Sequence, residues 1–112
     1  MPVTFINALR VPANRADEFL DKWQAGADYV LSRPGCLAST LHRNVDPTGP
    51  HQFFTVAVWE TPEHFVDATS TEWWQSFVDA FGFGDSPDAF GAMPALCTVE
   101  VDSSGLFALS PA

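Results

Sequence analysis

Proline and glycine residues divide this chain into short segments, and the hydrophobic pattern changes from one segment to the next. Residues 3–11 alternate with the two-residue period of a strand. After a break at Pro12, the apolar residues within 14–32 recur at helical spacing until Pro34-Gly35 ends the pattern. Segments this short cannot form one long helix. The chain can fold only by packing short helices against short strands.

A strong turn signal predicts a β-hairpin in the middle of the chain. Residues 46–50 read Asp-Pro-Thr-Gly-Pro, and proline and glycine favour turns over regular structure. They separate two segments with strand character, 36–45 and 51–60. Because the connection is short, we expect these two strands to be antiparallel neighbours.

A second helical region is predicted to begin at Thr61. Threonine is a common N-cap, Pro62 suits the first helical position, and an acidic residue follows. The apolar helical face continues to Phe81. A cluster of hydroxyl residues at 69–71 predicts a division into two helices, with Ser70 as the new cap.

The order of these elements predicts an α+β fold of the ferredoxin-like type. With a fourth strand over 95–102, after a glycine-rich loop at 82–94, the order is β-α-β-β-α-β. This arrangement gives an antiparallel sheet with both helices on one face. The 112 residues suffice for one domain, with a core over 3–101 and a tail over 103–112. Asn14 is expected to cap the first helix.

The sheet face opposite the helices would be left open in a single copy of the chain. The first strand is largely apolar on both faces, which suggests that both are covered. At ~25 cal/mol per Å², exposing an apolar face of several hundred Å² forfeits several kcal/mol. We therefore expect a homodimer in which two sheets cover one another.

The charge distribution excludes two classes of partner. The net charge is −9, and all five Lys and Arg residues lie within 1–43. Binding to nucleic acid and to anionic membranes depends on basic residues, so neither partner is expected. No apolar run approaches the roughly 18 residues that span a bilayer, and the first residues lack signal-peptide character. We expect a cytoplasmic protein.

The sequence contains no motif for a metal or a nucleotide cofactor. His42, His51 and His64 lack the spacing of zinc ligands. Cys36 and Cys97 lie far apart in segments with strand character, and we interpret them as free thiols. The predicted chemistry therefore uses neither a metal nor a resident cofactor.

Aromatic residues are the unusual resource of this chain, which has four Trp, ten Phe and one Tyr. A bulky core explains part of this content, but tryptophan N–H groups need hydrogen-bond partners that a small core rarely supplies. The alternative is a ring-lined cavity between the helices and the sheet, which would suit a flat aromatic ligand. The residues predicted to bind such a ligand are Phe5, Phe65, Trp73, Trp74, Phe77 and Phe81.

Two polar residues are candidates for chemistry in this cavity. Asn7 shares a strand face with apolar residues such as Phe5 and Leu9, so it either ties down backbone or faces a ligand. His64, at the start of the second helical region, is either a solvated residue or a base at the cavity rim. Histidine suits the second role because it exchanges protons near neutral pH.

Several features together resemble the antibiotic biosynthesis monooxygenase family. They are the element order, Asn7 on the first strand, the turn Arg33-Pro34-Gly35-Cys36, and the segment Val56 to Glu63 with Trp59-Glu60 at the strand end. The resemblance covers residues 3–101. It implies a dimeric α+β barrel, which agrees with the expectation from the open sheet face.

The resemblance implies several activities. One branch of the family oxidises anthrone-like and phenolic polyketides to quinones with O2, without metal or flavin. Another binds and degrades haem, and others are isomerases. Relative to the haem branch, Asn7 and Trp59 match, and the iron-ligating His corresponds to the region of Phe77. Relative to the quinone-forming branch, Trp59 matches, while Thr55 and Phe65 stand in place of Asn and Tyr.

We therefore predict a cofactor-independent monooxygenase that oxidises a polycyclic aromatic substrate to a quinone, with O2 as co-substrate. Asn7 and Trp59 would donate hydrogen bonds to a developing oxyanion, and His64 would act as the base. Three alternatives stay open. They are a polyketide cyclase or isomerase on the same fold, a non-catalytic dimer that binds haem or another aromatic ligand, and a structural dimerisation module.

Overall fold

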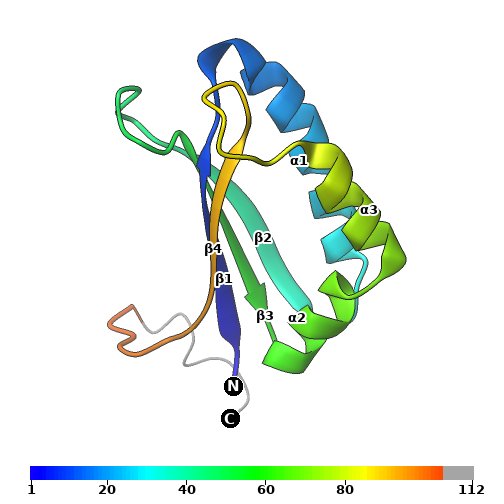
Figure 1. Cartoon of the computed structure of the whole chain (residues 1–112). Coiled ribbons are helices and arrows are strands. Elements are labelled where there is room, and N and C mark those ends of the chain that lie inside the picture. Colours follow the sequence, from blue (N-terminus) through cyan, green and yellow to red (C-terminus); the bar gives the residue numbers. More distant parts are fainter. Residues whose placement is uncertain (105–112) are drawn as a thin grey trace.

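The structure, a computed structural model, describes residues 1–104 (Figure 1). Its elements in chain order are β1 (Val3–Arg10), the short 3-10 helix η1 (Ala13–Arg15), α1 (Ala16–Leu31), β2 (Cys36–Arg43), β3 (Phe53–Trp59), α2 (Pro62–Thr69), α3 (Glu72–Phe81) and β4 (Gly91–Thr98). Most of the tail predicted over 103–112 lies outside the described residues. Within them, no helix is long and apolar enough to cross a membrane.

The four strands form one antiparallel sheet in the order β2-β3-β1-β4. The helices all lie on one face of it (Figure 1), so the predicted ferredoxin-like α+β class is confirmed. The hairpin strands stop a little short of their predicted bounds, at Arg43 and Phe53. Because β1 is central, it is paired on both sides. Asn7 lies opposite Thr55 of β3 and Pro94 of β4.

Two clusters of buried apolar side chains join the helices to the sheet. The first cluster consists of Leu9, Val11, Phe19, Phe53, Phe81 and Phe90. The second cluster consists of Val3, Val30, Ala57, Trp59 and Ala68. Leu9 and Val3 belong to different clusters and stand near opposite ends of β1. The helical layer is therefore anchored to the sheet at two separate places.

The start of α1 differs from the prediction that Asn14 caps it. Residues Ala13–Arg15 form a 3-10 turn in which the Arg15 N–H donates to the Pro12 carbonyl at 2.9 Å. The α-helix then begins at Ala16 without a side-chain cap. Proline fixes its own φ in an extended conformation here and starts a tight turn. Asn14 consequently lies inside that turn and not at the start of the helix.

The start of α2 agrees with the prediction, whereas the start of α3 differs by one residue. Thr61 accepts a hydrogen bond from a backbone N–H of the first turn, and Pro62 is the first helical residue. The second helical region is divided as predicted, but Thr71 and not Ser70 caps α3. The Ser70 hydroxyl instead donates to the Val66 carbonyl at 2.6 Å, which uses it at the end of α2.

β4 lies closer to α3 than predicted, because it runs from Gly91 to Thr98 and not over 95–102. Pro94 argues against a strand in the sequence, since proline cannot donate a ladder hydrogen bond. β4 is an edge strand, however, and its proline is tolerated there. The preceding loop is therefore limited to residues 82–90.

Three basic side chains from the first half of the chain form hydrogen bonds to the backbone of the second half and hold it in place. They donate to backbone carbonyl oxygens at 2.8 to 3.3 Å. The acceptors are Gly84 and Ser86 for Arg10, Asp88 for Arg15, and Ala80 and Phe81 for Lys22. Lys22 thus neutralises the negative end of the α3 dipole, and the two arginines fix the loop at 82–90 against the end of the sheet.

Replacing Phe19 by Ala is expected to lower the free energy of unfolding by about 3–5 kcal/mol. The Phe19 ring is fully buried and contacts the rings of Phe53, Phe81 and Phe90 at centroid distances of 5.0 to 5.7 Å. Urea unfolding measures the loss. Val45→Ala, at a fully exposed position, should change the value by less than about 0.5 kcal/mol. An equally small effect of Phe19→Ala would contradict the role assigned to the first cluster.

Candidate functional site

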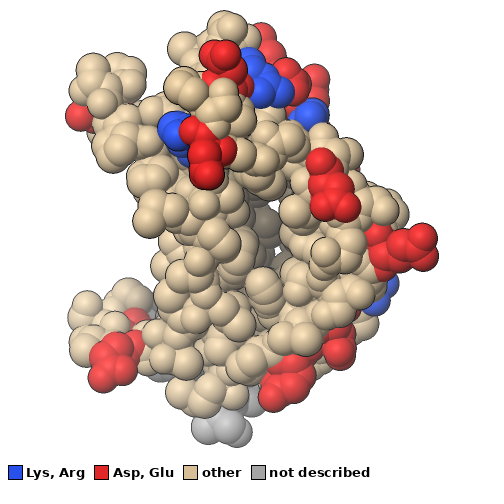
Figure 2. Space-filling view, in the orientation of Figure 1, with Lys and Arg blue, Asp and Glu red and all other residues tan. Residues whose placement is uncertain are grey.

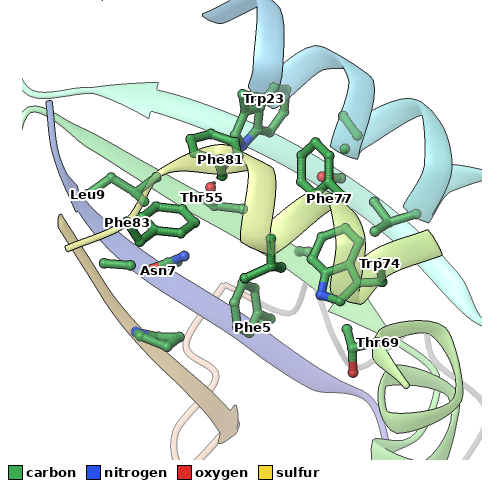
Figure 3. A pocket seen from close by; sticks show the side chains of 18 of the residues that line it. Phe5, Asn7, Leu9, Trp23, Thr55, Thr69, Trp74, Phe77, Phe81 and Phe83 are labelled. Atoms are coloured by element: carbon green, nitrogen blue, oxygen red, sulfur yellow. Dashed lines mark hydrogen bonds between the residues drawn. The ribbon is translucent and has the colours of Figure 1, made fainter. Parts of the chain in front are cut away.

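A pocket of about 430 Å³ lies between the helices and the sheet. Side chains of both buried clusters contribute to its lining, together with residues from the middle of α1, α3, β1 and β3. Figure 2 shows the molecule hollowed between its two layers, and Figure 3 shows the lining side chains from close by. The volume falls within the range of small-molecule sites.

Most of the residues predicted to form the site line this pocket. They are Phe5, Asn7, Trp59, Phe65, Trp74, Phe77 and Phe81. The rings pack against one another, with centroids 5.0 Å apart for Phe5 and Phe65 and 5.2 Å apart for Trp74 and Phe77. The pocket therefore has aromatic walls on the sheet side and on the helix side. Contact of these residues with a ligand stays a prediction.

Two of the predicted site residues are not in the lining, His64 and Trp73. The His64 Nδ1 lies 2.8 Å from the Thr61 hydroxyl, and its ring packs on Gly35 so closely that a Cβ there would be 2.2 Å from Cγ. The Trp73 ring stacks on Tyr29 at 4.1 Å and is 46% exposed. The structure thus places the residue predicted as a base in the α2 cap.

The lining of the pocket is electrically neutral. Among the described residues that line it, none is Asp, Glu, His, Lys, Arg, Cys or Tyr. Its polar side chains are Asn7, Trp23, Ser39, Thr55, Trp59, Thr69, Trp74 and Gln75. The pocket can therefore donate and accept hydrogen bonds, but its own side chains cannot exchange a proton at ordinary pH.

Asn7 holds a fixed orientation in the floor of the pocket. Its Oδ1 accepts the backbone N–H of Met93 at 3.1 Å. Since only the carbonyl end of an amide can accept from an N–H, this contact settles which end is which. Figure 3 shows the amide nitrogen turned toward the interior. Of the two roles considered for Asn7, the structure shows the backbone tie, and within residues 1–104 the amide N–H groups have no hydrogen-bond partner; contact with a ligand stays a prediction.

A tryptophan on α1 and a threonine on β3 form a hydrogen bond beside Asn7. The Trp23 Nε1–H donates to Thr55 Oγ1 at 2.9 Å. Sequence reasoning missed this pair, because 32 residues separate its members. Strand alternation does place Thr55 on the face of Ala57 and Trp59, but no sequence pattern predicts which helix residue lies above it.

Trp59 lies at a distance from Asn7 in the floor of the pocket. Its partner on β1 is Val3, whereas the partner of Asn7 on β3 is Thr55. Four residues along a strand correspond to about 13 Å. The Trp59 ring contacts Phe65 at 5.9 Å in an edge-to-face arrangement. Trp59 therefore contributes to one end of the pocket and Asn7 to the middle.

The loop at 82–90 closes the other end of the pocket. Phe83 lines it and stacks on Phe81, with ring centroids 4.6 Å apart. Phe83 also forms an isolated parallel β-bridge with Phe90, whose side chain is fully buried. With Arg10 and Arg15 bonded to the same loop, this end is held by both side-chain and backbone contacts.

The charged and thiol groups lie away from the pocket. Acidic and basic side chains are spread over the outer surface of the helices and loops (Figure 2). Cys36 and Cys97 are free thiols outside the lining. Burial raises the pKa of the Cys36 thiol, which disfavours the reactive thiolate. Within residues 1–104, no group of three or more His, Cys, Asp or Glu residues is placed to hold a metal ion.

Comparison with known proteins points to one family. A family model described as antibiotic biosynthesis monooxygenase matches residues 2–80. A mycobilin-producing haem oxygenase of Mycobacterium tuberculosis strain H37Rv is 38% identical over 65 residues. That match includes 58% of this chain and 60% of the relative, so the chain spans only part of the curated relative's length.

Solved structures share the fold along most of the chain. A candidate monooxygenase from Shewanella loihica PV-4 is 29% identical, with a TM-score of 0.72 and coverage of 90% of this chain and 96% of that chain. SnoaB, a cofactor-independent oxygenase from Streptomyces nogalater, is 21% identical, with a TM-score of 0.70 and coverage of 92% and 97%. The likeness to SnoaB shows the fold alone.

Gly26→Ala is expected to weaken binding of aromatic ligands several-fold. A Cβ at Gly26 would lie 2.7 Å from Cζ of Phe77, so the Phe77 ring, which lines the pocket, must shift and change the shape of the lining. Quenching of tryptophan fluorescence by 2-hydroxyanthraquinone measures the affinity. Ala25→Ser, at an exposed position of the same helix, is the control. Unchanged affinity in Gly26→Ala would contradict the assignment.

Proposed function

Because the chain belongs to the antibiotic biosynthesis monooxygenase family, we propose that it oxidises a polycyclic phenol or anthrone to a quinone with O2 and without a resident cofactor. The observation that carries the proposal is the pocket itself. It has aromatic walls for a flat ring system, and its polar groups are neutral hydrogen-bonding side chains. Such a site suits an aromatic substrate that carries one or two oxygens.

The proposed reaction requires little chemistry from the protein. An anthrone loses a proton to give an enolate, which transfers an electron to O2. The two radicals combine to a peroxide, and loss of water gives the quinone, so that one anthrone and one O2 yield one quinone and one H2O. The protein holds the anion beside O2 in a largely apolar space and donates hydrogen bonds to its oxygen.

In the proposed reaction, the group that loses the proton is therefore on the substrate and not on the protein. Since no lining side chain among the described residues is ionisable, the proton leaves to water or before binding. His64, bonded to Thr61 outside the lining, has no part in this scheme. The pocket favours the reaction by preferring the anion, because hydrogen bonds to a charged oxygen are stronger than those to a neutral one.

Haem is the second candidate ligand, since the curated relative is named a haem oxygenase. Haem iron is held in proteins by an axial His, Cys, Met or Tyr. None of these residue types lines the pocket in the part of the chain that the structure describes. Phe77, in the region where the resemblance implies an iron-ligating His, is in the lining. These lining residues do not provide the axial ligand that haem iron requires.

We also propose that the working unit is a homodimer built on the open sheet face. Ile6 and Met93 on that face are 40% and 65% exposed. The helices lie on the opposite face (Figure 1). A second copy of the same face would bury these apolar side chains and leave both pockets, on the helix side, accessible.

The purified, chelator-treated protein is expected to consume O2 and form quinone when given anthrone. At saturating substrate, the rate should rise with pH up to the pKa of the bound substrate and then level off, because the anion reduces O2. With a second substrate of different acidity, the inflection should move to the new substrate's pKa. Oxygen-electrode traces and quinone absorbance across pH measure this.

Asn7→Ala and Trp59→Phe are the matched tests of the site in that assay. Asn7→Ala should lower kcat while the unfolding midpoint changes little. Trp59→Phe, which alters the second buried cluster, should lower the unfolding midpoint and reduce kcat less than Asn7→Ala does. An inflection that stays at one pH for both substrates would reveal a protein base and contradict the scheme. Product formation without O2 uptake would instead support a cyclase or isomerase. No turnover of anthrones, naphthols or tetracyclic phenols would overturn the proposed oxidation.

Ile6→Asp is expected to convert the dimer to a monomer. The carboxylate would stand in the middle of an apolar interface, where an unpaired charge is costly. Size-exclusion chromatography with light scattering should give twice the 12.2 kDa chain mass for the parent protein and that mass for the variant. Leu31→Asp, at a 52% exposed residue of α1, should remain dimeric. A monomeric parent protein would overturn the proposal.

A further inference from the structure

The middle of the pocket floor contains two hydrogen-bond donors on neighbouring strands. We propose that the Thr55 hydroxyl, oriented by the Trp23 indole, and the Asn7 amide together bind a single ligand oxygen in its anionic form. The inference rests on the proposed function and deepens it. It names the atoms that recognise the substrate anion and assigns Trp23 as a positioning residue.

The hydrogen bond from Trp23 decides what Thr55 can do. Its Nε1–H has no acceptor capacity, so in this contact the Thr55 oxygen must accept. The hydroxyl proton of Thr55 then has to point elsewhere. It donates no hydrogen bond to another group among residues 1–104, and Thr55 lines the pocket. The hydroxyl is thereby set as a donor toward a ligand.

Asn7 is set as a donor by a separate contact. The Met93 N–H occupies its Oδ1, which directs the Nδ2 group into the pocket (Figure 3). Nδ2 has no hydrogen-bond partner in the described part of the chain. In both side chains a protein donor therefore engages the acceptor oxygen and fixes its orientation, and the side chain's own donor makes no protein hydrogen bond within residues 1–104.

The two donors come from residues that face each other across neighbouring strands. Asn7 and Thr55 are direct partners in the β1–β3 pairing and both line the pocket. Side chains directly opposite one another on a sheet have Cβ atoms about 5 Å apart. Trp59, four residues further along β3, is about 13 Å away. Thr55 is thus the partner of Asn7 at the oxygen, in place of the predicted Trp59.

The surroundings of these two donors favour the phenolate form of a bound ligand over the neutral phenol. A neutral phenol donates its own O–H and can accept from the free donors only with an uncharged oxygen, whereas a phenolate accepts from both donors with a charged oxygen, which makes each of these bonds stronger. A phenolate has only lone pairs to offer. No lining residue in the described part of the chain carries a negative charge, so nothing in the lining repels the anion. In apolar surroundings, each bond to it gains strength.

The test measures the pKa of a bound phenol, not turnover. The probe is 2-hydroxyanthraquinone, whose absorbance distinguishes phenol from phenolate. In the parent protein, the pKa of the bound probe should lie below that of the free probe. Thr55→Val, which removes the hydroxyl and keeps the shape, should raise the bound pKa by about one unit, a roughly ten-fold loss of preference for the anion. Thr55→Ser should retain the preference.

Trp23→Phe separates positioning from packing. It keeps an aromatic ring on α1 but removes the N–H, so it should raise the bound pKa in the same direction as Thr55→Val. In the double variant, the Trp23 change should have no further effect, because it acts through the Thr55 hydroxyl. A Trp23→Phe protein that is only less stable, with an unchanged bound pKa, would overturn the positioning role.

Thr69→Val is the matched control. Thr69 also lines the pocket, but its hydroxyl already donates to the Phe65 carbonyl at 2.8 Å, so its removal should leave the bound pKa unchanged. Equal effects of Thr69→Val and Thr55→Val would overturn the two-donor site. So would a bound pKa no lower than the free value, or a parent protein that fails to bind the probe. Oxygen uptake with anthrone decides the proposed function independently of these outcomes.

Discussion

The width of aromatic rings sets the distance between the helices and the sheet, and the pocket depends on that distance. At one end, the Phe19 ring of α1 stacks on Phe53 of the sheet with centroids 5.0 Å apart and meets Phe81 of α3 edge-on at 5.7 Å. At the other end, Trp59 and Phe65 meet in the same edge-to-face way. Rings do not flatten as aliphatic chains can. The layers therefore cannot close over the space between the two clusters, and the pocket is a product of how the core packs.

Local signals in the sequence predicted the order of the elements and the face of β1, but not contacts between distant residues. Thr61 and the turn at 46–50 act within a few positions, so their effects were readable. The position of β4 depends on its pairing with β1. Pro94 within β4 made this segment look unlike a strand in the sequence. In the site, too, local features were predictable from the sequence and contacts between distant residues were not. Strand alternation placed Asn7 with its apolar neighbours, whereas the hydrogen bond that orients Thr55 comes from a helix 32 residues away.

The chain is strongly acidic, but its pocket lining is neutral. A few polar groups in the pocket can therefore determine the energy of a bound anion. The net charge of −9 is carried by side chains outside the pocket lining, where water and salt screen it over roughly 10 Å. Inside, there is no charged group among the described lining residues. The energy of a bound anion then depends on the direction of individual N–H and O–H groups. Asn7 and Thr55 are each held in direction by a second protein group, which avoids reorganisation when the anion binds.

The fastening of the second half of the chain by Arg10, Arg15 and Lys22 has a consequence for acid tolerance. The acceptors in these contacts are backbone carbonyl oxygens, which do not take up protons in the range where Asp and Glu titrate. Ion pairs with carboxylates are lost as those groups are neutralised in acid. The hydrogen bonds that hold the loop at 82–90 and the end of α3 are not lost in this way, because their acceptors are not protonated. As the pH falls, the fourteen acidic residues lose their mutual repulsion, while Arg10, Arg15 and Lys22 keep the carbonyl partners through which they join the two halves of the fold.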